Sequence, residues 1–208
     1  MDKDQKQLFL KKNDKLINIK IKNIHMQELL FIKITKFFLE NPYDEVYLRE
    51  IAKKIKISPF AAKKYIDILL KENIIQEERK ANLRYIKANV NNPFYKHLKI
   101  AFNINLILKS GLIEYLKESI PNITSITLYG SLAKGEDDKK SDIDLLVIGK
   151  EKHLNLEKFA DKINKEITLH IFSWSEWNEN AKKNKAYYLD VIAYGIPIYG
   201  ELPIVRWK

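Results

Sequence analysis

The chain has 208 residues, with 37 Lys and Arg against 27 Asp and Glu, which gives a formal net charge of +10. It contains no cysteine, so disulfide bonds and thiolate metal sites are excluded. No apolar run is as long as a membrane span, and Met1-Asp2-Lys3-Asp4 lacks the layout of a secretory signal, so we expect a cytoplasmic protein with no membrane partner.

The basic excess lies mainly in the first half of the chain. Such a bias attracts polyanions such as nucleic acids, and the alternative is a lysine-rich solvated surface without a dedicated partner. Residues 1–23 form an N-terminal extension in which Ile17, Ile19 and Ile21 alternate with polar residues, and this alternation predicts a short strand.

Three helices and a hairpin are predicted next. Apolar residues recur at helical spacing from Ile24 to Glu40, and again from Leu48 to Ile55. Ser58 and Pro59 are typical of a helix start, and the helix that follows reaches Glu72. Two β-rich runs, at residues 74–78 and 83–87, predict a two-stranded wing.

This order of elements over residues 24–92 resembles a winged helix-turn-helix domain. The resemblance implies that the helix from Pro59 to Glu72 is the recognition helix. It also implies DNA contacts from that helix and from the wing, namely Lys63, Lys64, Tyr65, Lys71, Arg79, Lys80 and Arg84. Winged helices also serve as protein docking modules, so DNA binding and protein binding both remain open.

Asn91-Asn92-Pro93 marks a domain boundary. A connecting helix is predicted over residues 93–120, with a broad apolar surface along Tyr95 to Ser119. This surface needs a cover, which the following sheet, the winged helix or a second copy of the chain can supply. We expect a homodimer contact to contribute.

The chemistry is concentrated after this helix. The β-rich run from Ile123 to Tyr129 stops at Gly130-Ser131, where the backbone amides and the serine hydroxyl can bind phosphate oxygens. After a further ten residues come Asp142 and Asp144, which share one face of a strand. Paired carboxylates on a buried strand need a positive partner, and Mg²⁺ prefers oxygen ligands. The alternative is a polar turn capped by Ser141 and Asp142.

Gly130-Ser131 followed by Asp142-Ile143-Asp144 resembles the signature of the polymerase-beta-like nucleotidyltransferase superfamily. The wider stretch from Tyr129 to Gly149 resembles its minimal members in archaea and bacteria, and the pairing with a winged helix resembles a set of two-domain archaeal proteins. The resemblance covers about residues 110–200. It implies an α+β fold in which a mixed sheet flanked by helices occupies residues 121–208.

The resemblance also implies the roles of the site residues. Asp142 and Asp144 would bind two Mg²⁺ ions, and a triphosphate from ATP or another NTP would lie in the Gly130-Ser131 loop. The nucleotide contacts implied are Gly130, Ser131, Lys134 and Ser141. Lys134 is either a phosphate partner or an ordinary surface residue.

Active members of the superfamily place a third carboxylate on a neighbouring strand. The corresponding strand here is predicted over Glu166 to Phe172, and the matching position is Thr168 or His170, neither of which is an acid. Four alternatives remain: catalysis with two carboxylates, a catalytic role for His170 as ligand or base, rescue by Glu166, or nucleotide binding without turnover. Asp190, on a helix with Tyr187 and Tyr188, is a more distant candidate.

Three functions follow from these alternatives. The first is Mg²⁺-dependent transfer of an NMP, expected to be AMP from ATP, to a protein or small-molecule hydroxyl. Minimal nucleotidyltransferases often resemble antitoxins that modify a HEPN-domain toxin, so a HEPN protein is the expected partner. The second is a DNA-binding transcriptional regulator with a weak or inactive nucleotidyltransferase domain. The third, an antibiotic-modifying transferase, has no support beyond the fold.

Overall fold

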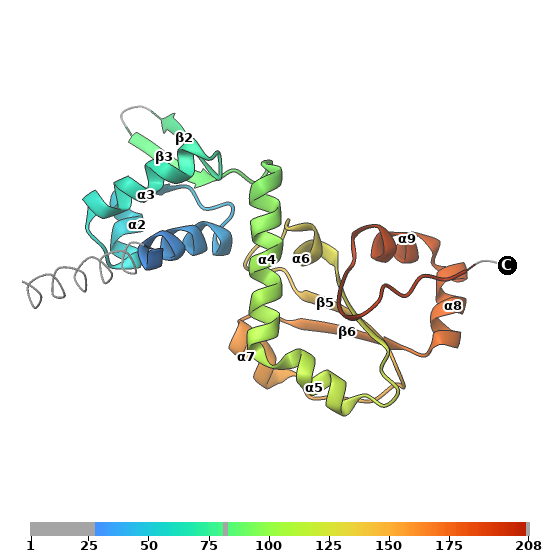
Figure 1. The fold of residues 1–208 in the computed structure, drawn as a ribbon. Helices are drawn as coiled ribbons and strands as arrows, with labels where there is room; N and C mark the ends of the chain where they lie inside the picture. Colours follow the sequence, from blue (N-terminus) through green and yellow to red (C-terminus); the bar gives the residue numbers. More distant parts are fainter. Residues whose placement is uncertain (1–27, 81–82, 207–208) are drawn as a thin grey trace, which may run out of the picture. The chain divides into compact units, whose positions relative to one another are not determined.

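The computed structural model describes residues 28–80 and 83–206 (Figure 1). The strand expected at Ile17 to Ile21 lies outside this range. The chain forms two compact units that divide between Ala88 and Asn89, with residues 41–43 grouped in the second unit. Among the described residues, no helix combines the length and apolar character needed to cross a bilayer.

The N-terminal unit contains helices and a small antiparallel sheet. A helix at residues 28–40 precedes the other elements, which are β1 (Val46–Tyr47), α2 (Leu48–Ile55), α3 (Pro59–Lys71), β2 (Ile75–Lys80) and β3 (Leu83–Ala88). The strand order is β1-β3-β2. As its sequence predicts, α3 is capped by Ser58, whose side chain accepts a hydrogen bond from the Ala61 amide at 3.1 Å.

The C-terminal unit is built on a four-stranded sheet in the order β6-β5-β4-β7. Its strands are β4 (Ser125–Tyr129), β5 (Ile143–Ile148), β6 (Ile167–Phe172) and β7 (Ile196–Gly200). β5 pairs with β6 in parallel, and β4 is antiparallel to both β5 and β7. The sheet is therefore mixed, and the predicted α+β fold class is confirmed.

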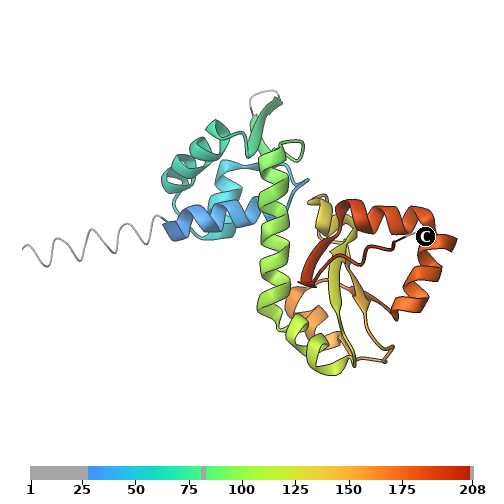
Figure 2. The same cartoon turned by 45° about the vertical axis from the view of Figure 1, so that its right-hand side comes forward.

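Helices cover both faces of this sheet (Figures 1 and 2). They are α4 (Pro93–Ser110), α5 (Leu112–Ser119), α6 (Gly130–Lys134), α7 (Glu157–Ile163), α8 (Trp174–Lys183) and α9 (Lys185–Tyr194). Residues of α4, α5 and α7 pack with the odd-numbered residues of β5, which include Leu145 and Val147. Residues of α8 and α9 pack with Leu146 and Ile148 on the opposite face. Side chains alternate along β5 as a strand requires.

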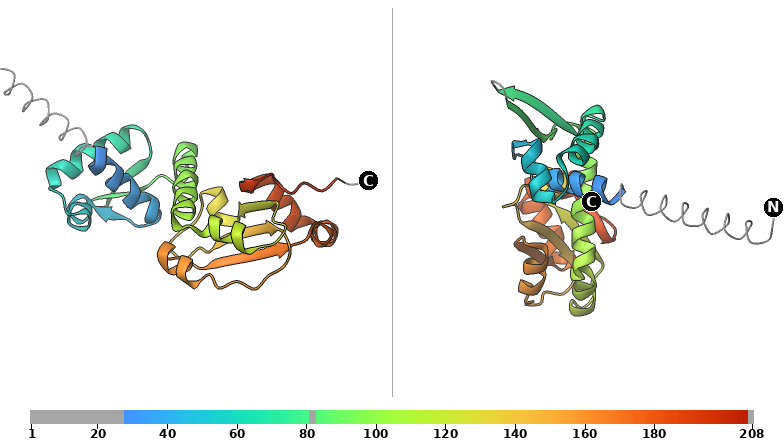
Figure 3. Two further views of the ribbon diagram at one scale, coloured as in Figure 1. Left: turned by 60° about the horizontal axis from the view of Figure 1, so that its bottom comes forward. Right: turned by 90° about the vertical axis from the view of Figure 1, so that its left-hand side faces the viewer.

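The helix expected from Tyr95 to Ser119 is two helices, so that prediction was wrong in its continuity. Gly111 ends α4 in a left-handed conformation, with φ of 84°, and α5 leaves in a new direction (Figures 1 and 3). The buried face of α4 also differs from the apolar one expected. It includes Lys99 and Asn103, whereas Leu108 is 45% exposed.

Candidate active site

Asp144 lies at the start of β5, on the sheet face that α8 and α9 cover. It follows buried Ile143 and precedes buried Leu145, so alternation places it with Leu146 and Ile148. In the antiparallel ladder its partner is Tyr129, the last residue of β4. The turn after Tyr129 therefore begins beside this carboxylate.

Gly130 lies directly against Asp144. A Cβ atom added to Gly130 would lie 2.2 Å from Asp144 Oδ2, and Gly130 has a φ of 71°. No other residue type fits this position without moving the acid or straining the backbone. The structure thus brings together the turn and one of the two carboxylates that the sequence singled out.

Asp142 precedes β5 and opens onto a groove of about 540 Å³. The groove is lined by the loop before β5, the end of α7 and the residues that lead into β6, including Lys165 and Glu166. Glu166, which the sequence offered as a substitute third acid, therefore shares a groove with Asp142. Within residues 28–80 and 83–206, however, no three acidic or histidine side chains come close enough together to hold a metal ion.

Asp142 and the surrounding protein influence the ionisation of Asp144. Burial raises the pKa of Asp144 above its usual value, and the negative charge of Asp142 raises it further, while His170 acts in the opposite direction. Two carboxylates that share a half-buried site are stabilised by a divalent cation with oxygen ligands. The pair therefore fits such an ion, with the remaining ligand positions open to other oxygen donors.

The strand register identifies the residue opposite Asp144 on β6. Asp144 pairs with Thr168, and Leu146 pairs with His170. Partners in a parallel ladder point to the same side, so Thr168 stands beside Asp144 and His170 one repeat further along. The neighbouring strand thus offers a hydroxyl beside Asp144, where a third carboxylate would lie.

His170 is exposed and is held through one ring nitrogen. Its Nδ1 lies 2.7 Å from the hydroxyl of Tyr129. Tyr129 contacts this ring at a tilt and Tyr187 contacts it edge to face, and burial raises the pKa of both tyrosines. The tyrosines therefore pack around His170 in an aromatic cluster, which also includes Trp177.

The other expected nucleotide contacts have protein partners. Lys134 Nζ lies 2.6 Å from Asp190 Oδ1 and 4.8 Å from the ring centre of Tyr194. The Ser141 hydroxyl donates to Asp138 Oδ1 and accepts from the Asp138 amide, both at 2.9 Å. A phosphate at Lys134 would compete with Asp190, and Ser141 organises the loop before β5. Ser131 is the second residue of α6, and within the described part of the chain its side chain makes no hydrogen bond that would assign it a role.

In the N-terminal unit the expected DNA contacts divide into three groups. Lys63, Lys64 and Lys71 are exposed on α3, and Arg79 is exposed on β2. Tyr65 is only 5% exposed and packs against Phe31. The remaining cations of the hairpin are in ion pairs, Lys80 with Glu45 and Arg84 with Glu77.

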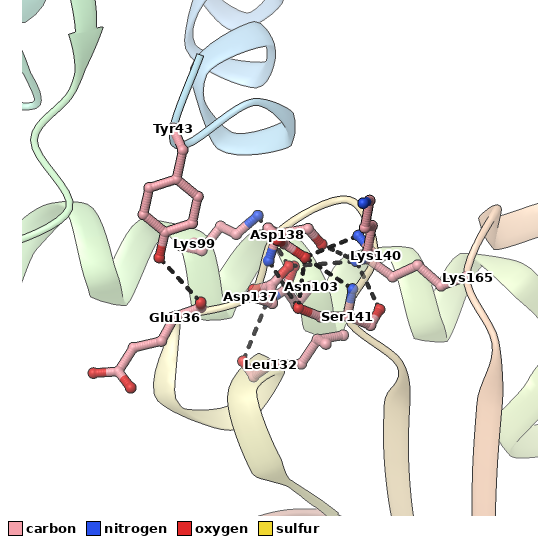
Figure 4. Close-up of polar contacts among 10 residues, drawn as sticks. All are labelled: Tyr43, Lys99, Asn103, Leu132, Glu136, Asp137, Asp138, Lys140, Ser141 and Lys165. Atoms are coloured by element: carbon pink, nitrogen blue, oxygen red, sulfur yellow. Dashed lines mark hydrogen bonds and ion pairs between the residues drawn. The ribbon is translucent and has the colours of Figure 1, made fainter. Parts of the chain in front are cut away.

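The sequence reasoning missed a buried polar cluster behind the loop that leads to Asp142. The cluster consists of Lys99, Asn103, Asp137 and Lys165 (Figure 4). Lys99 and Asn103 are one helical turn apart on α4, and this spacing is the only local sequence signal that the two side chains lie together. Asp137 and Lys165 lie in loops, and no periodic pattern marks them.

Residues 109–192 match the family model described as "Nucleotidyltransferase domain". The comparison with curated proteins gives no match. Similar solved structures include "Crystal structure of the toxin-antitoxin with AMP-PNP", with 24% identity over 48% of this chain and 74% of that one and a TM-score of 0.34. A mutant of the toxin-antitoxin pair MntA-HpeT has 21% identity over 45% of this chain and 72% of its own, with a TM-score of 0.33. Over residues 109–192 the chain is therefore similar to the nucleotidyltransferase family.

Proposed function

We propose that the chain transfers a nucleoside monophosphate from an NTP, with ATP as the expected donor, to a hydroxyl group. The observation that carries this proposal is the contact between Gly130 and Asp144, in which a Cβ atom on the glycine would lie 2.2 Å from the carboxylate. A turn suited to phosphate oxygens and an acid suited to a metal ion meet there. The match of residues 109–192 to the nucleotidyltransferase family supports the same reaction.

Asp142 and Asp144 are the proposed ligands of Mg²⁺. The ion, when bound, supplies charge neutralisation at the triphosphate and at the pyrophosphate that leaves. The raised pKa of Asp144 reflects burial and the charge of Asp142, which a cation would offset. Because no three acidic side chains lie close enough together among the described residues to hold a metal ion, phosphate oxygens of the nucleotide are the proposed additional donors.

The remaining groups bind the substrate and accept a proton. The oxygen of the acceptor hydroxyl forms a bond to the α-phosphorus, the bond from that phosphorus to the bridging oxygen breaks, and pyrophosphate leaves. His170 is the proposed proton acceptor, because Tyr129 orients its ring at 2.7 Å and the ring is exposed. Gly130, Ser131 and Lys134 are the proposed phosphate contacts.

The acceptor that we propose is a hydroxyl on a HEPN-domain toxin, for which this chain would be the antitoxin. This proposal rests on the resemblance of the stretch from Tyr129 to Gly149 to minimal nucleotidyltransferases. An acceptor would approach through the groove beside Asp142, which is open and lined by charged side chains of both signs.

The test is label transfer from α-³²P-ATP with Mg²⁺, to the chain itself and to a HEPN protein encoded beside it. Asp142→Asn/Asp144→Asn should abolish labelling, because both metal ligands lose their charge. Glu114→Gln, an exposed acid on α5, is the matched control and should label as the wild type does. If the double variant still transfers label, the proposed site is wrong.

A second function is supported by the exposed lysines of α3. Lys63, Lys64 and Lys71 lie on one exposed helix in a unit of the winged-helix type that we propose. In this alternative the chain regulates transcription and the nucleotidyltransferase domain has little or no activity. Absence of labelling, together with salt-dependent binding to the promoter of its own gene, would favour this alternative.

A further inference from the structure

The buried cluster behind Asp142 holds more charge than a small core normally contains. The Asp137 side chain has no exposed surface, and Lys99 Nζ lies 3.0 Å from its Oδ2. Lys165 Nζ lies 3.7 Å from the same oxygen, and its side chain is 10% exposed. Buried ions are costly, and apolar residues of similar volume often give equal stability. Stability alone therefore gives a weak reason for these residues.

The cluster ties three separate segments to one loop. Asn103 on α4 donates to Asp137 Oδ1 at 2.6 Å and to the Leu132 carbonyl at 3.2 Å. Lys165, just before β6, donates to the carbonyls of Asp138 and Ser141, the latter at 3.0 Å. Figure 4 shows these groups gathered around the loop between α6 and β5. The Glu136 amide of this loop also donates to the Ser131 carbonyl of α6 at 3.0 Å. The loop that ends at Asp142 is thus held from α4, from α6 and from Lys165, which precedes β6.

The contacts converge on the two peptide groups of Asp142. The Ser141 carbonyl, which accepts from Lys165, belongs to the peptide before Asp142. The Ile143 amide, which belongs to the peptide after it, donates to the Glu166 carbonyl at 2.8 Å. Consecutive residues, Lys165 and Glu166, therefore fix the backbone on both sides of the proposed metal ligand. With both peptides fixed, few directions remain open to the Asp142 carboxylate.

We propose that Lys165 and Asp137 are positioning residues, which fix the Ser141–Asp142 peptide so that the Asp142 carboxylate is placed to bind the divalent metal of the reaction. This inference rests on the proposed function, because that function identifies the metal as Mg²⁺. Asp137 acts on Lys165: its carboxylate, itself held by Lys99 and Asn103, keeps the ammonium directed toward the loop. Groups that orient a metal ligand typically change metal affinity or activity 10- to 100-fold when they are lost.

The test compares Lys165→Met with a matched lysine on α7. Lys165→Met keeps the apolar stem and loses every donor to the loop. Lys162 Nζ also donates to a carbonyl, that of Ser110, at 2.9 Å, and Ser110 lies at the end of α4 rather than in the loop before β5. Lys162→Met therefore removes a comparable lysine anchor. Mg²⁺ binding is followed by calorimetry in the presence of a saturating non-hydrolysable ATP analogue, and thermal melts report the stability of each variant.

We expect Lys165→Met to need about 10- to 100-fold more Mg²⁺ for half-saturation. Lys162→Met should lose stability and keep the half-saturation of the wild type. Lys165→Arg, which retains the charge and donors, should recover part of the loss. Equal half-saturation for Lys165→Met, Lys162→Met and the wild type would overturn the proposal and leave the cluster a purely structural one.

Two further outcomes are informative. A wild type that binds Mg²⁺ with the analogue but transfers no nucleotide would refute the proposed function, while the comparison of half-saturations would still decide the positioning role. A wild type that binds no Mg²⁺ with the analogue would refute both. If Lys165→Met does not fold, Asp138→Ala is the substitute, because it removes the half-exposed carboxylate that accepts hydrogen bonds from the Lys140 and Ser141 amides. It should shift half-saturation in the same direction by up to about 10-fold.

Discussion

Thr168 stands directly across from Asp144 in the parallel ladder of β5 and β6. The two side chains point to the same side of the sheet, so an acid at position 168 would lie next to the Asp144 carboxylate. A carboxylate at position 168 would therefore face the proposed metal site, whereas the residue there carries a hydroxyl.

Thr168→Asp is expected to strengthen metal binding. Without Mg²⁺ the added charge should repel Asp144 and lower the melting temperature, whereas with Mg²⁺ the stabilisation should exceed that of the wild type. Half-saturation by Mg²⁺ should fall on the order of 10-fold. Thr168→Asn is the neutral control of the same size. If the Asp and Asn variants respond to Mg²⁺ alike, position 168 does not face the metal.

Gly130→Ala should abolish Mg²⁺-dependent nucleotide binding, because the new Cβ would displace the Asp144 carboxylate. The left-handed backbone adds a cost of about 1–2 kcal/mol to the free energy of folding. Gly111→Ala is the control: its φ of 84° imposes the same backbone cost, but nothing lies within 4 Å of the added atom. Similar binding by both variants would show that the Gly130–Asp144 contact is unimportant for the site.

The loop before β5 should lose stability in acid. Hydrogen bonds from the Ser141 hydroxyl and then the Lys140 amide lower the pKa of Asp138 in the folded chain. A depressed folded pKa gives stability that is complete above the unfolded value, about 3.9, and is lost as pH falls through the folded value.

This linkage can be measured against Asp138→Asn, which keeps an acceptor oxygen and loses the charge. At pH 7 the wild type should have a higher melting temperature than Asp138→Asn. This difference in melting temperature should shrink as pH falls below about 4. A difference that stays constant from neutral pH to pH 3 would show that the Asp138 charge adds nothing to the loop.

If the N-terminal unit binds DNA, Lys63→Ala/Lys64→Ala should weaken binding and reduce its salt dependence. Each lost phosphate contact reduces the magnitude of the slope of log K against log salt by about 0.9, so the loss of two contacts should reduce it by about 1.8. Lys80→Ala/Arg84→Ala should have a smaller effect, because these cations already pair with Glu45 and Glu77. Equal effects of the two double variants would contradict a role centred on α3.

The strand and turn of the site were predictable because their signals are local. Alternation of acid and aliphatic residues from Asp142 onward identifies β5 and its two faces, and Gly130 at the end of a β-rich run identifies the turn. Strand register is not local, since a shift of one repeat is equally compatible with the sequence. The sequence alone is therefore compatible with either Thr168 or His170 opposite Asp144. The pairing of β5 with β6 identifies Thr168.

The interior of α4 could not be predicted from hydrophobicity. Lys99 and Asn103 are buried because Asp137, 38 and 34 positions away, supplies their charge and hydrogen-bond partners. Helical periodicity favours Leu98 and Leu108 for the core, yet Leu108 is 45% exposed. Apart from the spacing of Lys99 and Asn103 by one helical turn, a buried ionic cluster built from distant segments leaves no periodic signal in the chain.

β5 has a neighbour on each side, and every residue in it except Asp144 is buried. Amide protons on such a central strand exchange with solvent only when the domain opens as a whole, whereas those of β6 and β7, at the two edges, exchange through local fraying. Asp144 therefore lies on the strand of its domain that is expected to resist local unfolding most. Local opening at either edge of the sheet therefore leaves the backbone of Asp144 in place.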